Sequence, residues 1–507
     1  MAHFTKKRSG LKTILPGILF LTFNCYSIAQ TTVVKISAGY IKGITEDQSI
    51  VFRGVPYAQP PVGDLRFKAP QSHLPWADTL SCIKFGNIAA QYDGGQKKMI
   101  GSEDCLTLNV YEPANHASEK MPVIVWIHGG GMTNGSGRGE NGHAFSDNDG
   151  IIAITINYRL GAMGFTYLGD VGKQYATSGN NGLQDCIMAL KWIKDNISAF
   201  GGDPSRVTVM GQSAGAKLVS AVSVSPESKG LFKQLVIESG GVQCIRDSGT
   251  AKLIRKRMLD TLGISNAADL VNLPTEKIIE AQGKVLSGAQ GTNYFGPVDD
   301  GMVITGDPYQ YINQHGNPKI RILMGTTKYE SLLFMKFDPR LYHPDSVVLK
   351  GWFGNNYPYI LSSYKQALNH NTADTAAIKV LTQYMYQMHS YRLAEELAQD
   401  GNEVLMYRFD YTKDGTAATH AQELPYVWYL PQKAKQVDSV LAAQVHSAWV
   451  SFIKGENVQV ANQAWPNYNS TSRQVFIFDQ TPYIKNLNHV YNDPSFPSAC
   501  FVLKQNN

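Results

Sequence analysis

The sequence has few cysteines and few charged residues, and it lacks the short motifs that hold metal ions. Six of its 507 residues are cysteine, 17% are charged, and neither a C-x-x-C pair nor an H-E-x-x-H motif occurs. We therefore expect no metal site and no cofactor. The formal net charge of +5 owes most of its excess to four cations near the N-terminus, Lys6, Lys7, Arg8 and Lys12. The rest of the chain is close to neutral, which argues against nucleic acid as a partner.

The N-terminal apolar run is too short to cross a bilayer. It occupies residues 14–23, follows the four cations and precedes 27–29, where serine and alanine stand at the two positions that signal peptidase requires to be small. We expect residues 1–29 to be a signal peptide, a mature chain that begins near Gln30, and a secreted or periplasmic protein without an integral membrane segment. A lipoprotein anchor at Cys25 is the disfavoured alternative, because bulky and polar residues precede it.

The remaining five cysteines suit an oxidising compartment. Cys82 and Cys105 bracket a loop that contains glycine and lysine, and closing this loop would stabilise the fold, so we expect a disulfide there. Cys186 falls on the apolar face of a predicted helix, where a free core thiol is expected. Cys244 and Cys500 can pair only if the fold brings them together.

A strand, a sharp turn and a helix are predicted around a G-x-S-x-G pentapeptide at residues 211–215. Residues 206–210 are β-formers, and residues 216–221 favour a helix that ends before Pro226. The flanking glycines permit a turn too tight for Cβ atoms, so that Ser213 stands at the rim of a sheet, as in a nucleophile elbow. Such a pentapeptide also arises by chance, so the interpretation needs support from its neighbours.

A glycine run follows the apolar strand predicted at residues 123–127. It reads His128-Gly129-Gly130-Gly131, and it allows backbone N–H groups to approach an anion closely. A flexible turn is the plain alternative, and a phosphate-binding loop is disfavoured because no Gly-Lys-Ser/Thr follows. Upstream of an elbow, this run predicts the oxyanion hole of an esterase.

Strands and helices alternate along the chain, which predicts an α/β fold around a parallel sheet. We expect a helix from residue 181, an extended segment at 52–67 that packs over the sheet, and mostly helical structure at 340–400. Further strands are expected at 151–158, 234–238, 320–325, 403–411 and 474–478. No internal repeat, low-complexity tract or linker divides residues 30–507, so we expect a single domain.

A nucleophilic serine needs a histidine base and an acid that orients the histidine. In the α/β-hydrolase order both follow the serine, each on a loop after a strand. His420 follows the strand at 403–411 through a loop of small residues, and we expect it to be the base. His389 and His446 lie in helical stretches, where we expect surface roles.

The acid is one of the carboxylates between the elbow and the base: Asp299, Asp300, Glu330 or Asp338. Glu330 comes a few residues after the buried strand at 320–325, whereas the others lie in turns, where solvated carboxylates are common. The spacing therefore favours Glu330.

Taken together, several stretches resemble the type-B carboxylesterases, the family of cholinesterases and lipases, and in particular bacterial secreted carboxylesterases. The matching stretches cover nearly the whole mature length: 52–67, 102–106, the H-G-G-G run, 157–159, 179–204, the elbow and 420–425. The resemblance implies an α/β-hydrolase fold, with a central and mostly parallel sheet flanked by helices. It also implies large helical insertions that form the substrate pocket.

The resemblance further assigns roles to individual residues. It implies a small-molecule ester as the substrate, no cofactor, and a disulfide between Cys82 and Cys105. The implied catalytic residues are Ser213, Glu330 and His420, with the oxyanion held by the backbone N–H groups of Gly130, Gly131 and Ala214.

Departures from the family pattern bear on the substrate. Gln212 stands where glutamate is frequent, Ser331 stands where glycine is common, and residues 83–104 contain no tryptophan. Cholinesterases place in that loop the aromatic ring that binds quaternary ammonium. We therefore expect hydrolysis of neutral carboxylic esters rather than choline esters.

Two alternatives differ in class from this interpretation. A non-catalytic cholinesterase-like binding module would typically lack the serine or the histidine. A lipase for longer acyl chains would need an apolar lid, whereas residues 83–104 are polar. Protease and thioesterase chemistry, the acyl-chain length, the alcohol group and the oligomeric state stay open.

Overall fold

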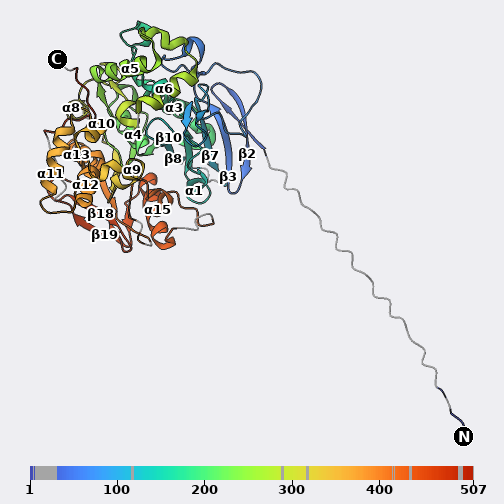
Figure 1. Cartoon of the computed structure of the whole chain (residues 1–507). Coiled ribbons are helices and arrows are strands. Elements are labelled where there is room, and N and C mark those ends of the chain that lie inside the picture. The colour runs from blue at the N-terminus through green and yellow to red at the C-terminus, as the bar shows by residue number, and fades with distance from the viewer. Residues whose placement is uncertain are drawn as a thin grey trace.

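The structure is a computed structural model of the chain (Figure 1). It describes residues 1–3, 5, 31–115, 119–286, 291–315, 319–413, 415, 417–432, 437–488 and 495–505. The expected apolar leader, Cys25 and the expected cleavage site near Gln30 lie outside these residues. Within them, no helix combines the length and the apolar character that a membrane span requires.

A mixed sheet runs through the centre of the molecule (Figure 1), with thirteen strands in the described part of the chain. The middle of the sheet, from β9 to β18, is parallel, and antiparallel strands extend it at both ends. A short strand, β4 (Leu80–Ser81), pairs with β2. In spatial order the other strands are β1 (Thr31–Ile36), β2 (Gly39–Glu46), β3 (Ser49–Pro56), β7 (Thr107–Pro113), β9 (Ile152–Ile156), β8 (Met121–Ile127), β10 (Gly202–Gln212), β11 (Gln234–Glu238), β14 (Arg321–Thr327), β15 (Glu403–Phe409), β18 (Gln474–Phe478) and β19 (Tyr483–Asn486).

Helices cover both faces of the parallel centre, and for this reason every residue of β8 is buried. Alternate side chains of a strand point to opposite faces. Val125 belongs to the core shared with α3 (Asn181–Asn196) and α4 (Ala214–Ser223). Its neighbour Trp126 belongs to the core shared with α15 (Ser439–Lys454). These strands have near-continuous apolar sequences because helices pack on both faces of the sheet.

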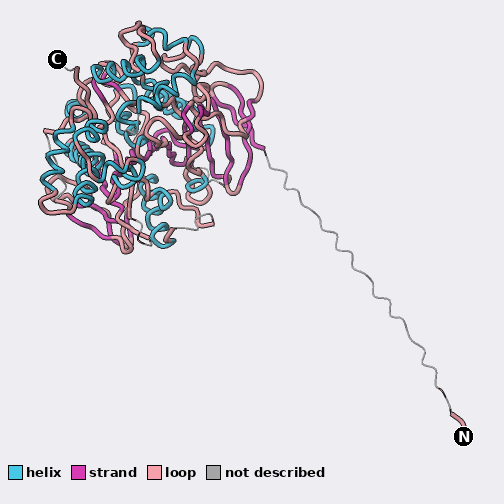
Figure 2. Tube along the Cα trace, in the orientation of Figure 1, coloured by secondary structure: helices cyan, strands magenta, loops and turns pink. Residues whose placement is uncertain are grey.

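Two long helical insertions connect neighbouring strands of the sheet. The tube view shows the helices packed around the strands (Figure 2). Between β11 and β14 lie α5 (Ser248–Leu262), α6 (Thr275–Leu286), α7 (Gly291–Tyr294) and α8 (Pro308–His315). Between β14 and β15 lie α9 (Ser331–Phe337), α10 (Ser346–Phe353), α11 (Tyr357–Ala367), α12 (Ala373–Thr382), the π-helical turn η8 (Gln383–Gln387) and α13 (Met388–Gln399). The second insertion has a hydrophobic core of its own.

Shorter elements complete the described fold. They are β5 (Gln91–Asp93) with β6 (Lys98–Ile100), β12 (Arg246–Asp247) with β13 (Val298–Asp299), β16 (Gln459–Val460) with β17 (Gln463–Ala464), and the short helices α1 (His143–Ser146), α2 (Gly161–Phe165) and α14 (Leu424–Val427).

The expected strands and helices around the pentapeptide are all present. One segment differs, because residues 52–56 belong to β3, inside the sheet between β2 and β7. The prediction that 52–67 packs over the sheet is therefore wrong for its first part. The pairing register shifts between Phe52 and Val55, so a bulge absorbs the glycine between them. Pro56 is the last residue of the strand, a position at which the ladder tolerates its missing N–H.

The expected disulfide is not present in the structure, in which Cys82 and Cys105 are free, buried thiols. Both belong to the main hydrophobic core, where burial raises the pKa of Cys82 to about 12 and raises the pKa of Cys105 as well. Loop length determines what a crosslink would gain in entropy, but pairing also requires the side chains to point at each other. Cys186 is a buried free thiol as expected, and Cys244 and Cys500 are likewise free.

Candidate active site

A tight strand-to-helix turn carries Ser213. β10 ends at Gln212, α4 begins at Ala214, and Ser213 between them has φ 58° and ψ −120°, a strained conformation for a side-chain-bearing residue. A Cβ on Gly215 would lie 1.9 Å from the carbonyl oxygen of Ile127, at the end of β8. Only glycine allows this approach, as the sequence predicted.

The glycine run after β8 lies against this turn. A Cβ on Gly129 would lie 3.4 Å from the Cβ of Ser213. Gly130 and Gly131 have φ values of 100° and 65°, a region that favours glycine. The fold therefore brings Ser213, the glycine run and the N-terminus of α4, where Ala214 lies, to one place.

A buried ion-pair-like contact joins Glu330 and His420. Nδ1 of His420 lies 2.5 Å from Oε2 of Glu330, and both side chains are almost fully buried. The other carboxylate oxygen accepts a hydrogen bond from the Ser239 hydroxyl and one from the Thr327 N–H, each at 2.7 Å. Because a carboxylate only accepts, Nδ1 carries the proton, and the lone pair of Nε2 is left as a base.

The other candidate carboxylates have structural partners instead. Asp300 accepts backbone N–H bonds within its own turn and one from the Asn180 amide. Asp338 pairs with Arg340, and Asp299 accepts from the N–H of Gly306. Of the four predicted candidates, Glu330 is the one that contacts His420.

The base side of His420 faces the turn that carries Ser213. Its Nε2 lies 3.3 Å from Nε2 of Gln212, which donates to it. Among the described residues, the Ser213 hydroxyl makes no hydrogen bond to His420. Catalytic hydrogen bonds are often long or absent until substrate binds, so this arrangement is compatible with transfer of the Ser213 proton to His420.

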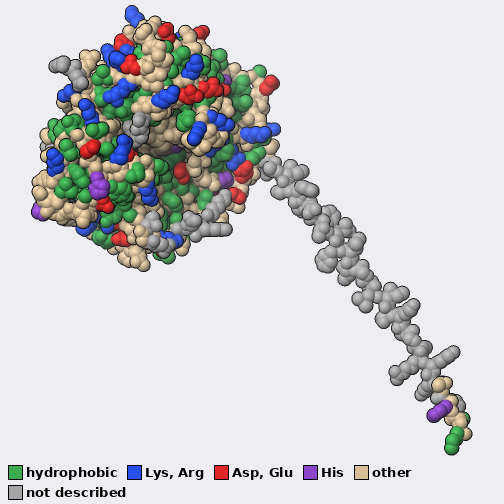
Figure 3. Space-filling model, in the orientation of Figure 1, with side chains coloured by type: hydrophobic (Ala, Val, Ile, Leu, Met, Phe, Trp, Pro, Cys, Tyr) green, Lys and Arg blue, Asp and Glu red, His purple; other side chains and the backbone are tan. Residues whose placement is uncertain are grey.

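Aromatic rings surround His420. The ring centroids of Phe334, on α9, and Tyr386, on η8, lie 5.2 and 4.6 Å from that of His420. The two rings also stack on each other, with centroids 5.7 Å apart. Both come from the insertion between β14 and β15. The face of the molecule that Figure 3 shows is hollowed near its centre.

Three other histidines are structural. His128 is buried and stacks on Tyr158, and burial lowers its pKa to about 4. His389 is only 1% exposed, and burial lowers its pKa to about 3, so the expected surface role is wrong. His446 is also not a surface residue, because it is partly buried and its Nε2 contacts Asp149 at 3.0 Å. Helical periodicity places His389 and His446 on helices but does not show what packs over them.

Two buried carboxylates near Glu330 were not predicted. Glu238 is the last residue of β11 and accepts a hydrogen bond from Trp449. The second residue is Glu423, and neither of its carboxylate oxygens has a hydrogen-bond partner among the described residues. Burial, assisted by the charge of Glu330, raises the pKa of Glu423 to about 8. Burial and the nearby Glu423 raise the pKa of Glu238 well above its usual range. The position of Glu423, three residues after His420, was the available sequence clue.

The raised pKa of Glu423 predicts a pH-dependent loss of stability. In the unfolded chain its pKa is near 4.5, so between about pH 4.5 and 8 the folded state retains a proton that the unfolded state has lost. The free energy of unfolding therefore falls over this interval as pH rises, by up to about 1.4 kcal/mol per pH unit. Glu423→Gln cannot ionise, so its unfolding midpoint in urea should fall less between pH 5 and 8 than that of the wild type. The exposed Glu280→Gln serves as the control, and equal slopes for all three proteins would contradict the prediction.

Comparison with known proteins gives the family and the fold of the chain. The model of the carboxylesterase family matches residues 30–493. The para-nitrobenzyl esterase of Bacillus subtilis is 31% identical, over 90% of this chain and 96% of its own, and the phenmedipham hydrolase of Pseudarthrobacter oxydans is 32% identical, over 89% and 94%. The crystal structure of Geobacillus stearothermophilus carboxylesterase EST55 superposes with a TM-score of 0.80 at 32% identity, covering 90% of this chain and 98% of that one. The chain therefore belongs to the carboxylesterase family, has the α/β-hydrolase fold, and is a carboxylic ester hydrolase.

Proposed function

We propose that the protein is a secreted serine carboxylesterase in which Ser213 is the nucleophile, His420 the base and Glu330 the acid. The observation that supports this most directly is the 2.5 Å contact between Nδ1 of His420 and Oε2 of Glu330. It leaves the basic nitrogen of the ring turned toward the elbow that holds Ser213. The proposed substrate is a small neutral carboxylic ester.

In the proposed reaction, His420 removes the proton of Ser213 while the serine oxygen attacks the ester carbonyl. The imidazolium that forms is stabilised by the carboxylate of Glu330. It then gives its proton to the departing alcohol and leaves an acyl group on Ser213. Water, activated by His420, releases the acid and restores the serine.

The negative charge on the carbonyl oxygen needs donors that are already in place. The N–H groups of Gly130, Gly131 and Ala214 are the proposed donors, because the glycine run packs against the elbow and α4 starts at Ala214. The helix N-terminus adds a favourable dipole.

A non-catalytic binding module is the alternative from another class. The buried contacts of Glu330 weigh against it. Burying a carboxylate costs free energy, and a binding module does not need a carboxylate that orients a histidine. A lipase is the second alternative. Its lid would come from residues 83–104, where the hairpin of β5 and β6 presents exposed Lys97 and Lys98 rather than apolar side chains.

The names of the relatives also suggest esters that carry no cationic group, since one is a para-nitrobenzyl esterase. Gln212 supports the same inference, because an amide replaces a carboxylate that would attract a cation. It is 4% exposed and contacts the proposed base directly.

Ser213→Ala should reduce kcat for p-nitrophenyl butyrate by at least about a thousandfold while the thermal midpoint stays close to that of the wild type, because the acyl acceptor is lost. Ser220→Ala, a buried hydroxyl on the same helix that binds the Ala216 carbonyl, should retain activity. Turnover by the Ser213 variant near the wild-type rate would contradict the assignment of the nucleophile.

Gln212→Glu should raise kcat/KM for butyrylcholine relative to butyl butanoate, because it returns a negative charge to the site. The carboxylate should also stabilise the imidazolium of His420, so the rise of kcat/KM for the neutral ester should move to higher pH. Both effects are read from one set of pH-rate profiles. An unchanged ratio of the two substrates would remove the support for neutral esters.

Secretion is proposed from the leader alone. Expression of the full chain in a bacterial host should deliver the protein outside the cytoplasm with an N-terminus near Gln30, as read by N-terminal sequencing. A mature chain that begins at Cys25, or an uncut leader, would contradict this proposal.

A further inference from the structure

A lysine is buried next to the proposed nucleophile. Lys217 is the fourth residue after Ser213, and its backbone N–H donates to the Ser213 carbonyl at 2.9 Å in the first turn of α4. Ser213 precedes α4 in a non-helical conformation, and this hydrogen bond keeps Lys217 one turn away from it. Only 2% of Lys217 is exposed, although lysine is almost never fully buried without a charged partner.

The ammonium group contacts one residue from each of the two helical insertions. Nζ donates to the Thr292 hydroxyl at 3.0 Å and lies 4.8 Å from the ring centroid of Tyr386, whose ring is the one that contacts His420. Thr292 follows Gly291, which packs so closely on Gly131 that a Cβ would lie 2.2 Å from the Gly131 carbonyl oxygen. Lys217 is therefore linked to His420 through Tyr386. It is linked to Gly131, a proposed oxyanion donor, through Thr292 and its neighbour Gly291.

The charge of Lys217 has no carboxylate partner among the described residues. The nearby Arg246 is also buried, and it donates to the carbonyls of Asn293, Cys244 and Thr292 rather than to an acid. Burial lowers the pKa of Arg246 to about 10 and lowers the pKa of Lys217 as well. Glu330 and Asp247 act on these two cations through space, without a hydrogen bond among the described residues, and an anion bound at Nζ of Lys217 would recover more of the cost of burying the charge.

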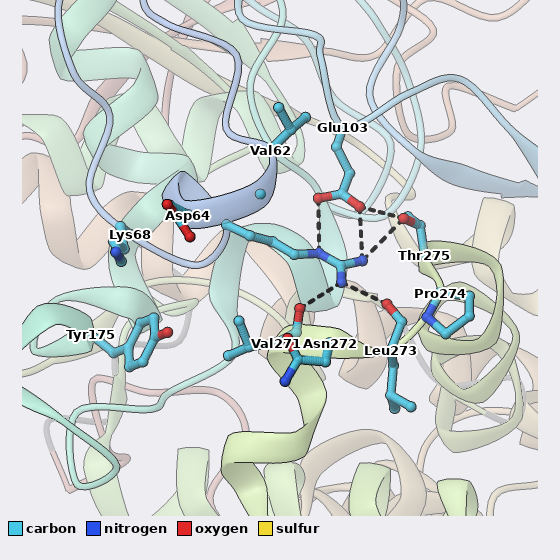
Figure 4. Close-up of a pocket in the computed structure, with 12 residues that line it drawn as sticks. Val62, Asp64, Lys68, Glu103, Tyr175, Val271, Asn272, Leu273, Pro274 and Thr275 are labelled. Carbon is cyan, nitrogen blue, oxygen red and sulfur yellow. Dashed lines mark hydrogen bonds and ion pairs between the residues drawn. The ribbon is translucent and has the colours of Figure 1, made fainter.

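Two other buried guanidinium groups in this chain form ion pairs with carboxylates. Arg159 pairs with Asp185 at 2.7 Å, and Arg66 pairs with Glu103 at 2.8 Å. Arg66 borders a cavity of about 470 Å³, but Glu103, the Thr275 hydroxyl and two backbone carbonyls take up its donors (Figure 4). Its guanidinium is thus fully engaged, whereas Nζ of Lys217 has one hydrogen-bond acceptor among the described residues for its three donors.

We propose that the Lys217 ammonium binds a carboxylate carried by the ester substrate, so that the enzyme prefers esters with a second, ionised acid group over uncharged esters of the same length. Monoesters of dicarboxylic acids are the favoured class, because the acid part stays attached to Ser213 while the alcohol leaves. This inference rests on the proposed serine-esterase reaction and differs from the proposed substrate only in the charge of the ester, which is anionic rather than neutral. Gln212, which removes a negative charge from the site, is consistent with it.

If Lys217 has a purely structural role, the expected effect of its substitution is different. The carboxylate of Glu330 favours the charged form of Lys217, so in this alternative the lysine is only a counter-charge for the proposed acid. In that case its loss would slow the hydrolysis of every ester by the same factor and shift every pH profile. An anion subsite would instead show its effect on acidic esters alone.

The test measures kcat/KM by pH-stat at neutral pH for matched pairs of esters. Ethyl hydrogen adipate and ethyl hexanoate place the carboxylate in the acid part, and 4-butanoyloxybutanoate and butyl butanoate place it in the alcohol part. The proteins are the wild type, Lys217→Met, which keeps the length of the side chain without its charge, Lys217→Arg, and the exposed control Lys256→Met. Thermal midpoints with and without adipate provide a readout that does not depend on turnover.

The wild type should favour the acidic member of at least one pair by about tenfold or more, as expected for a charged hydrogen bond in a buried site. Lys217→Met should lose that preference through a fall in kcat/KM for the acidic esters, Lys217→Arg should retain part of it, and Lys256→Met should match the wild type. Adipate should raise the thermal midpoint of the wild type but not that of Lys217→Met. The preferred pair then identifies the part of the substrate that carries the carboxylate.

An equal loss on acidic and neutral esters in Lys217→Met, or a wild type that hydrolyses both members of each pair equally well, would overturn the anion subsite and leave the esterase assignment intact. Absence of hydrolysis of all four esters by the wild type would instead contradict the proposed function itself.

Discussion

The architecture of the site depends on the close contact between Gly215 and the carbonyl of Ile127. Through this contact the first turn of α4 rests directly on the end of β8, where any larger residue would collide. Because β8 continues into the glycine run, the same contact sets the distance between that run and Ser213. The elbow and the loop are thus positioned by adjacent strands of one sheet, and the insertion between β11 and β14 adds a further contact through Gly291, which packs on Gly131.

Much of this arrangement could be predicted because it follows from local patterns. The apolar runs of β8, β10 and β11 have few alternatives to a buried parallel strand, and Glu330 could be selected by its place after β14. What could not be predicted depends on contacts between distant segments. The free thiols of Cys82 and Cys105 are one example, since sequence separation carries no information about side-chain direction.

The same limit explains why the buried charges near the site were missed. Glu238 is the last residue of a strand, and nothing in the pattern of that strand shows that Trp449 lies against it. Lys217 is the only charged residue of α4, and the sequence of this helix does not show that all of its residues are buried. In each case the charge is unusual because of what surrounds it, and the surroundings come from segments far away in the chain.

Charge near His420 is controlled by burial rather than by pairing alone. Glu330 is held by hydrogen bonds from Ser239, Thr327 and His420, as a carboxylate in the interior requires. Glu423, which has no such partners among the described residues, holds its proton at neutral pH. Two acids of the same chemical type therefore have different surroundings within one small region, and the pKa of Glu423, the one without hydrogen-bond donors, is raised.

The π-helical turn at Gln383–Gln387 gives the site an unusual sensitivity to chain length. A π-turn is wider than an α-turn because it accommodates an extra residue, and here it carries Tyr386, which touches both His420 and Lys217. Loss of one residue from this turn would restore a continuous α-helix through α12 and α13 and rotate Tyr386 by roughly 100° away from both partners. Because η8 lies in the insertion between β14 and β15, such a change would alter the surroundings of His420 without changing the sequence of the sheet or of the elbow.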